Sequence, residues 1–242
     1  MFDSIMMVLE IIGVIAFAIA GSVVAIDKEM DLVGVVFLAM ITSFCGGIMR
    51  DLVMGRTPLF FISLDLYISV ALITSLAVFF FAHIFKRWYV KNEHSILFFN
   101  NIIDAIGISA FSVSGVKMCL EFFPEPTPFL AIMMGVISAI GGGMVRDVCL
   151  RDIPFVFRKH IYALATALGA TVYYVLRIYV FAEGVTGDVV SLVIGMLSVF
   201  TIRVLATVFH WNLPKAINFS KMYAEAAESA VSSADNKENN IK

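Results

Sequence analysis

The chain alternates between long apolar runs and short breaks that are polar or contain proline. A helix needs about 20 mostly apolar residues to cross the hydrocarbon core of a bilayer, and each run has roughly this length. The pattern predicts an all-α integral membrane protein with seven transmembrane helices. We expect these helices at residues 5–26, 32–54, 63–85, 95–123, 129–150, 159–181 and 188–209.

The two ends of the chain need separate interpretation. The first run follows Asp3 rather than basic residues, and it is longer than the about 7–15 apolar residues of a signal-peptide core. We therefore expect it to stay in the membrane as a spanning helix. Residues 1–210 are predicted to form one transmembrane domain. The polar stretch 211–242 is predicted to be a disordered tail.

The composition of the chain excludes several classes of function. The chain is 60% hydrophobic and 15% charged, whereas about 25% of residues are charged in a typical soluble domain. A net charge of −2 gives no basic face for nucleic acid. The three cysteines have unrelated spacings, which favour neither a metal site nor a disulfide framework. Because the usual hydrolase, metalloprotease and nucleotide-binding motifs are missing, we expect no enzyme activity, cofactor or metal.

The distribution of Lys and Arg predicts the orientation. If the N-terminus is outside, the cytoplasmic segments hold about ten basic residues and the outer segments about three. Cytoplasmic loops of membrane proteins carry the excess of basic residues. We therefore expect a multi-pass protein of the cell (inner) membrane with its N-terminus outside and its C-terminus in the cytoplasm.

An internal duplication is the most specific feature. The motif Gly-Gly-x-x-Arg-Asp begins at Gly46 and again at Gly142, 96 residues later, and Pro58 matches Pro154 in the same register. Upstream, Gly21 pairs with Gly115 and Glu10 with Asp104 when the proline-rich loop is treated as a two-residue insertion. Chance is a weak explanation for a match of this kind.

The duplication predicts the architecture. Repeat one covers residues 5–85, repeat two covers 95–181, and the seventh helix, 188–209, lies outside the duplication. Each repeat has three spans, so the second repeat must enter the membrane from the opposite face. Inverted repeats of this kind occur in transporters, which bind their substrates near the bilayer midplane where the halves meet.

The paired glycines are candidates for the pore. Adjacent glycines weaken a helix by roughly 1 kcal/mol each relative to alanine. Freed backbone groups are tolerated inside a membrane only where they face protein or water. We therefore expect bends that line a polar path, with close helix packing as the alternative. The hinge candidates are Gly46, Gly47, Gly142 and Gly143.

Three hydroxyl residues precede the glycines and are further candidates for the pore lining: Thr42, Ser43 and Ser138. Their side chains can offer oxygen atoms to a passing ion. The alternative, equally compatible with the sequence, is that each hydroxyl bonds back to its own helix.

The charged half of each motif is expected to control the pore electrostatically. A charge near the bilayer centre costs at least about 2.5–3.5 kcal/mol, so two equivalent pairs facing lipid are not expected. We assign Arg50 and Arg146 to pore electrostatics and gating, with Asp51 and Asp147 holding them in place. Adjacent residues on a helix do not face each other, so each aspartate is expected to pair with a different helix. The alternative is that the arginines anchor the helices at the membrane interface.

Three other charged residues within the spans are candidates for the polar path. Lys117 is well inside the fourth span and nearly opposite Asp104 on the helix, so it is expected either to extend toward the interface or to gate the path. Glu10 and Asp104 fall in the first turns of their predicted spans. They are expected either to cap these helices or to line the polar path.

Two copies of a span with Ala-Gly or Ser-Gly, each followed by Gly-Gly-x-x-Arg-Asp-x-x-x-x-x-x-Pro, resemble the trimeric intracellular cation (TRIC) channel family. Its prokaryotic members include proteins named as glycine transporters. The resemblance implies a homotrimer with one pore in each subunit, lined by the glycine-bearing second and fifth spans. The first motif departs by having Cys45 where the second has Gly141. The lipid-binding Lys-Glu-Val stretch of the animal channels is missing, so phosphoinositide control is not implied.

The sequence therefore predicts a monovalent cation channel, with potassium as the ion, that works in the lipid bilayer as a homotrimer. The alternative is a carrier for a small neutral solute such as glycine. Inverted repeats serve both functions.

Overall fold

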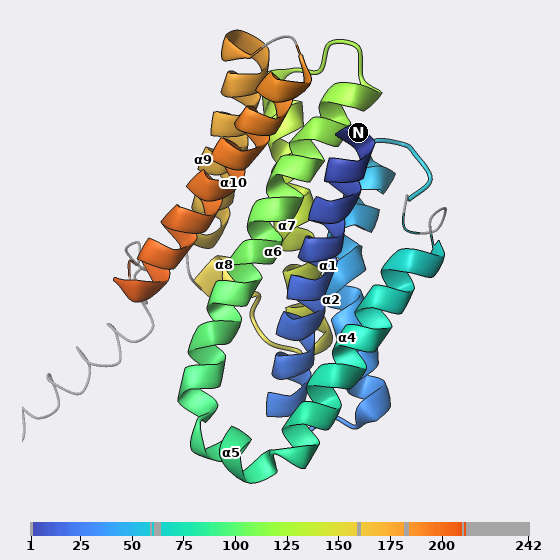
Figure 1. The fold of residues 1–242 in the computed structure, drawn as a ribbon, viewed down its shortest axis with the longest axis vertical. Helices are drawn as coiled ribbons and strands as arrows, with labels where there is room; N and C mark the ends of the chain where they lie inside the picture. Colours follow the sequence, from blue (N-terminus) through green and yellow to red (C-terminus); the bar gives the residue numbers. More distant parts are fainter. Residues whose placement is uncertain are drawn as a thin grey trace, which may run out of the picture. The chain divides into compact units, whose positions relative to one another are not determined.

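The computed structural model describes residues 2–58, 60, 64–158, 161–181, 184–209 and 211. Within these residues the chain is a bundle of long helices (Figure 1). The predicted tail, apart from Trp211, lies outside the described residues, so its disorder stays a prediction.

Seven helices in the described part of the chain are long and apolar enough to cross a membrane, as predicted. They are α1 (Phe2–Asp27), α2 (Leu32–Val53), α4 (Leu64–Ile84), α6 (Glu93–Phe122), α7 (Pro128–Cys149), α9 (Ile161–Val175) with the π-helix η1 (Leu176–Val180), and α10 (Val185–Val208). Two short helices were not predicted, α5 (Lys86–Lys91) and α8 (Phe155–Arg158).

Local chemistry sets where two of the central helices begin. The side chain of Asp31 accepts a hydrogen bond from Gly34 N at 2.8 Å and caps α2. Thr127 caps α7 in the same way through Leu130 N at 3.3 Å, and Pro128 occupies the first turn, where it costs no hydrogen bond. The equivalent helices of the two repeats therefore start with the same device.

The helices pack as two groups of three. In the first group α1, α2 and α4 contact one another, and in the second α6, α7 and α9 do so. Between the groups, α1 packs on α6 and α2 packs on α7. The seventh span, α10, packs on α9 and α6 at one side of the bundle (Figure 1). The first and second helices of one group therefore pack on the first and second helices of the other group. Only the second group is covered by α10.

Equivalent residues also contact each other across the two groups. Phe17 and Phe111 stack with ring centroids 5.3 Å apart and planes 5° apart. A Cβ on Gly13 would lie 3.0 Å from the Phe111 ring, and a Cβ on Gly107 would lie 2.7 Å from the Phe17 ring. Such reciprocity is what a two-fold axis between equal surfaces produces. With three spans in each group, the inverted repeats predicted from the sequence would place that axis in the plane of the membrane.

Candidate functional site at the interface between the repeats

The glycines Gly46 and Gly142 lie where α2 crosses α7. A Cβ on Gly46 would lie 2.1 Å from Ser138 O, and a Cβ on Gly142 would lie 2.0 Å from Thr42 O. No side chain fits at either position. Both helices stay helical through these residues, and the bends expected there stay a prediction. Close packing, the alternative considered from the sequence, describes their contacts.

The second glycine of each pair has a different environment. A Cβ on Gly47 would lie 2.3 Å from the Phe60 ring. At Gly143 the nearest atoms would be the Tyr162 hydroxyl at 3.3 Å and Arg146 Nη2 at 3.8 Å. Gly143 therefore faces polar side chains, and the space between Gly143, Arg146 and Tyr162 is too small to admit a water molecule. This constriction lies within repeat two, between α7, α8 and α9.

Two of the three candidate hydroxyls bond to their own helix. Thr42 Oγ1 donates to Leu38 O at 2.7 Å, and Ser43 Oγ donates to Ala39 O at 2.9 Å. The third, Ser138 Oγ, accepts from Arg50 Nη1 at 3.4 Å. Of the three, Ser138 is the one that meets a charged side chain from the other repeat.

The two Arg-Asp pairs are buried and bonded within each pair. Arg50 Nε donates to Asp51 Oδ1 at 2.8 Å, and Arg146 Nε donates to Asp147 Oδ1 at 2.9 Å. Each aspartate therefore pairs with its neighbouring arginine, which the sequence did not predict, because a long arginine side chain can fold back over the next residue. Asp147 Oδ2 also accepts from Phe155 N at 2.7 Å, which fixes the start of α8. Burial of both arginines does not fit interfacial anchoring.

Glu10 does not cap a helix, which corrects one of the two predicted roles. It lies eight residues after the start of α1 at Phe2, because the helix begins before the apolar run. Its carboxylate accepts from the Tyr67 hydroxyl of α4 and from Ser114 Oγ of α6, each at 3.0 Å. Among the described residues, no Lys, Arg or His nitrogen lies within ion-pair distance of it. Hydroxyl groups thus surround this buried carboxylate.

Asp104 is the equivalent carboxylate in repeat two, and it does not cap its helix either, since α6 begins 11 residues earlier at Glu93. Arg203 Nη2 of α10 lies 3.6 Å from Asp104 Oδ2. The Arg203 guanidinium also lies over the Tyr162 ring, 4.3 Å from its centroid. Asp104 further interacts with Arg146 and with the Tyr162 hydroxyl. Two cations therefore offset the charge of Asp104.

Lys117 belongs to another part of the molecule. Its ammonium pairs with Glu121 one turn further along α6, toward the helix end. It lines a cavity of about 450 Å³ that also contacts Arg177 and Asp188, themselves an ion pair. Of the two predicted roles, extension toward the end of the helix matches these contacts.

Sequence reasoning missed the partners of the two carboxylates. Arg203 is 3% exposed in the middle of an apolar run, and its isolation among apolar residues was a signal for a buried ion pair. Tyr67, Tyr162 and Ser114 carried no comparable signal, because tyrosine and serine are common in spans without any functional role.

A family model described as "Glycine transporter" matches this chain twice, over residues 7–83 and 101–177. The two matches fall on the two repeats. Among curated relatives, a UPF0126 membrane protein of Vibrio cholerae is 32% identical over 213 residues, with 87% of this chain and 82% of that protein covered. The UPF0126 inner membrane protein YadS of Escherichia coli is 32% identical, with 85% of this chain and 93% of that protein covered.

Comparison with solved structures supports the same family assignment. A TRIC trimeric intracellular cation channel orthologue from Rhodobacter sphaeroides is 33% identical with a TM-score of 0.73, covering 86% of this chain and 100% of that one. A prokaryotic TRIC channel is 32% identical with a TM-score of 0.75, covering 87% of this chain and 100% of that one. Family model, relatives and structures agree with the motifs in the sequence, and the chain therefore belongs to the prokaryotic TRIC channel family, whose sequence model is described as a glycine transporter.

Proposed function

We propose that each subunit conducts monovalent cations, with potassium as the physiological ion, along the interface between the two repeats. The observation that carries the proposal is the set of charged side chains buried inside the bundle of seven membrane spans. Arg50 and Asp51 are fully buried, and Arg146, Asp147, Asp104 and Arg203 are each less than 10% exposed. Charges at membrane depth are costly and mark ion pathways. The likeness to solved TRIC cation channels supports the same reading.

The proposed path runs past the crossing of α2 and α7. At this crossing Arg50 Nη2 lacks a hydrogen-bond partner within the described protein, and so do Asp104 Oδ1 and Arg203 Nε, which lie between α6 and α10. Buried polar atoms need a partner, and water or a passing ion supplies one in a pore. The constriction at Gly143 and Arg146 is the proposed gate, which opens when α7 shifts against α9. The hydroxyl of Ser138 and the carboxylate of Glu10 are the proposed oxygen contacts for the ion.

Assembly and location are also proposals. We infer a homotrimer with one pore in each subunit, since a solved relative is named a trimeric channel. We infer the inner membrane, where the YadS relative is placed by its name. The basic residues favour an outer N-terminus and a cytoplasmic C-terminus. A phosphatase reporter fused at the C-terminus should be inactive; activity in the periplasm would contradict this orientation.

The alternative function is a carrier for a small neutral solute such as glycine. The description of the matched family model favours it. A carrier alternates between two states, each closed to one side of the membrane. The closed constriction at Gly143 is compatible with one of these states.

Purified protein in liposomes separates the two functions. A channel should carry a potassium flux that follows the applied voltage, whereas a carrier should take up glycine saturably without conductance. Gly143→Leu should reduce the flux, because the side chain enters the constriction. Leu52→Ala, at a position 63% exposed on α2, is the control and should leave the flux unchanged. Saturable glycine uptake without a potassium current would overturn the channel proposal.

A further inference from the structure

The seventh helix covers one repeat and leaves the equivalent surface of the other without a helix. α10 packs against α9 and α6, and the corresponding helices of repeat one are α4 and α1. A crevice of about 470 Å³ lies there, closed at one end by α5. This volume falls within the range of about 300–1,000 Å³ that ligand pockets occupy. Its walls are apolar and include Ile19, Val23, Ala77, Phe81, Ile96 and Ile103.

One polar side chain interrupts these apolar walls. Asn100 of α6 lines the crevice and is 9% exposed, and its Oδ1 has no hydrogen-bond partner. It lies seven residues after the start of α6 at Glu93, or about 10 Å along the helix. The headgroup region of a bilayer is about 5–7 Å deep on each side, so Asn100 lies just inside the hydrocarbon layer, close to the ester groups of a phospholipid. The amide N–H of Asn100 can donate a hydrogen bond to an ester carbonyl at this level.

The roof of the crevice is the short helix α5, which joins two spans at the membrane surface. Trp88 and Tyr89 contribute to the lining, and tryptophan and tyrosine are enriched at this level of membranes. Arg87 and Lys91 are four residues apart and therefore share a face of the helix, next to Trp88 and opposite Tyr89. Both are exposed.

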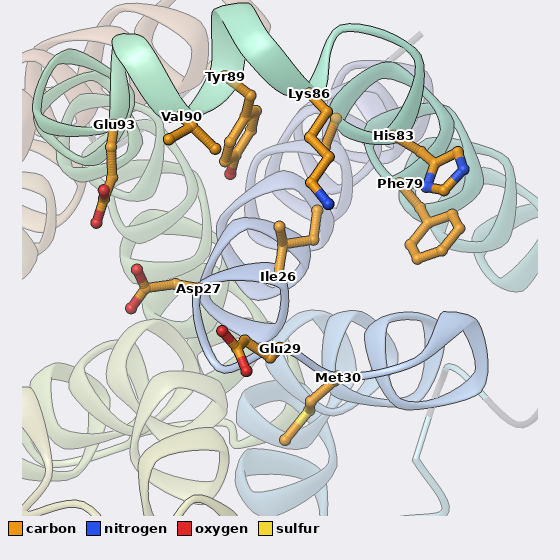
Figure 2. A pocket seen from close by; sticks show the side chains of 11 residues that line it. Ile26, Asp27, Glu29, Met30, Phe79, His83, Lys86, Tyr89, Val90 and Glu93 are labelled. Carbon is orange, nitrogen blue, oxygen red and sulfur yellow. The ribbon is translucent and has the colours of Figure 1, made fainter.

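The acidic residues near α5 lie on its other side. Figure 2 shows a second cavity, of about 470 Å³, in which Asp27, Glu29 and Glu93 gather and into which Lys86 points. Burial, together with the charges of Asp27 and Glu93, raises the pKa of the Tyr89 hydroxyl. The side chain of Tyr89 thus separates this acidic cavity from the apolar crevice, and Arg87 and Lys91 face away from the carboxylates.

We propose that the crevice between α1, α4 and α6 binds one acyl chain of an anionic phospholipid from the leaflet at the α5 end. Its phosphate rests on Arg87 and Lys91, and one of its ester carbonyls accepts a hydrogen bond from the Asn100 amide N–H. The lipid fills the position that α10 occupies in the other repeat. Exposed cations beside an apolar crevice suit a lipid better than a neighbouring subunit, because the centres of protein interfaces are depleted of charge.

Fluorescence quenching tests this directly. The chain has two tryptophans, so Trp211→Phe leaves Trp88 as the reporter. Phosphatidylglycerol with brominated chains should quench Trp88 at a lower mole fraction than brominated phosphatidylcholine. Arg87→Gln should reduce this preference by about fivefold, the effect of one basic side chain at an anionic surface, and Lys91→Gln should do the same. Arg151→Gln, an exposed arginine in the loop after α7, is the matched control and should leave the preference unchanged.

A second variant tests the crevice itself. Ala77→Phe adds a ring to the crevice wall and should reduce quenching by both lipids at an unchanged trimer yield. Equal quenching of the parent protein by the two lipids would overturn the selection of an anionic headgroup. Loss of the trimer in Ala77→Phe, with quenching retained in the remaining subunits, would assign the crevice to the subunit interface and overturn the proposal.

Discussion

Glu10 and Asp104 occupy equivalent places in the two repeats, but their carboxylates are stabilised by different groups. Hydroxyls of Tyr67 and Ser114 solvate Glu10, while Arg203 lies 3.6 Å from Asp104. The difference comes from α10, which has no counterpart in repeat one. A helix outside the duplication therefore makes two nearly equal halves electrostatically unequal.

The consequence concerns where a cation is attracted. A carboxylate that accepts hydrogen bonds from neutral groups keeps its negative charge available to an ion. The charge of Asp104 is less available, because Arg203 lies beside it and the cluster of Arg203, Arg146, Asp104 and Asp147 carries no net formal charge. If the protein conducts cations as proposed, a permeating cation should bind transiently near Glu10 and should not bind near Asp104.

The largest expected effect comes from removing the cation on α10. Arg203→Met leaves Asp104 buried with less compensation, and breaking one side of a buried ion pair typically costs about 3–5 kcal/mol. The thermal unfolding midpoint in detergent should fall sharply. Adding Asp104→Asn to the same chain should recover most of the loss, because no buried charge then remains uncompensated. Additive losses in the double variant would show that the two residues do not interact.

The glycine crossing should be the next most sensitive feature. Gly46→Ala and Gly142→Ala each place a Cβ about 2 Å from a carbonyl oxygen of the other helix, and overpacking costs about 1–3 kcal/mol. The two losses should be similar, since the contacts are reciprocal. Gly143→Ala is the control: its nearest neighbour would be 3.3 Å away, so stability should be unchanged or slightly increased. The thermal unfolding midpoints of the three variants measure these losses.

Glu10→Gln should affect conduction more than stability. The amide keeps the shape of the side chain and still accepts a hydrogen bond, so the loss should be about 1 kcal/mol, the difference between a charged and a neutral acceptor. The cation flux in liposomes should drop more than in Asp104→Asn, whose charge is already offset. A larger drop in Asp104→Asn would reverse the assignment of the attractive site.

The smallest effect is expected at the surface contact between the repeats. Lys28 Nζ lies 2.9 Å from Asp152 Oδ2, and both side chains are about 40% exposed. Exposed ion pairs contribute about 0–1 kcal/mol and are screened by salt. Lys28→Gln should therefore shift the unfolding midpoint very little, and less still at high salt. A loss comparable to that of Arg203→Met would mean that this contact is protected from solvent.

The spans and the duplication could be predicted because both leave strong local signals. About 20 apolar residues in a row specify a membrane helix, and the glycine motif fixes the alignment of the repeats. The helix starts were less accurate: α6 begins at Glu93, two residues before the apolar run, because polar residues can continue a helix into the interface.

Side-chain partners were harder to predict because they depend on contacts between distant segments. The rule that adjacent residues diverge on a helix holds for Cβ atoms, but Arg50 and Arg146 are long enough to reach back to the next residue. The pairing of Arg203 with Asp104 joins residues 99 positions apart, and nothing in either span indicates the other.

The stack of Phe17 on Phe111 and the reciprocal glycine contacts show that each repeat presents a surface fitted to its own copy, and the predicted inverted topology makes that copy upside down. A free three-span fragment would need such a copy in the same bilayer, and cells would have to insert half of the molecules in each direction. Joining the two repeats through α5 removes that requirement, because every chain contains one repeat in each orientation and holds the two at a high effective concentration. A single polypeptide therefore supplies both orientations.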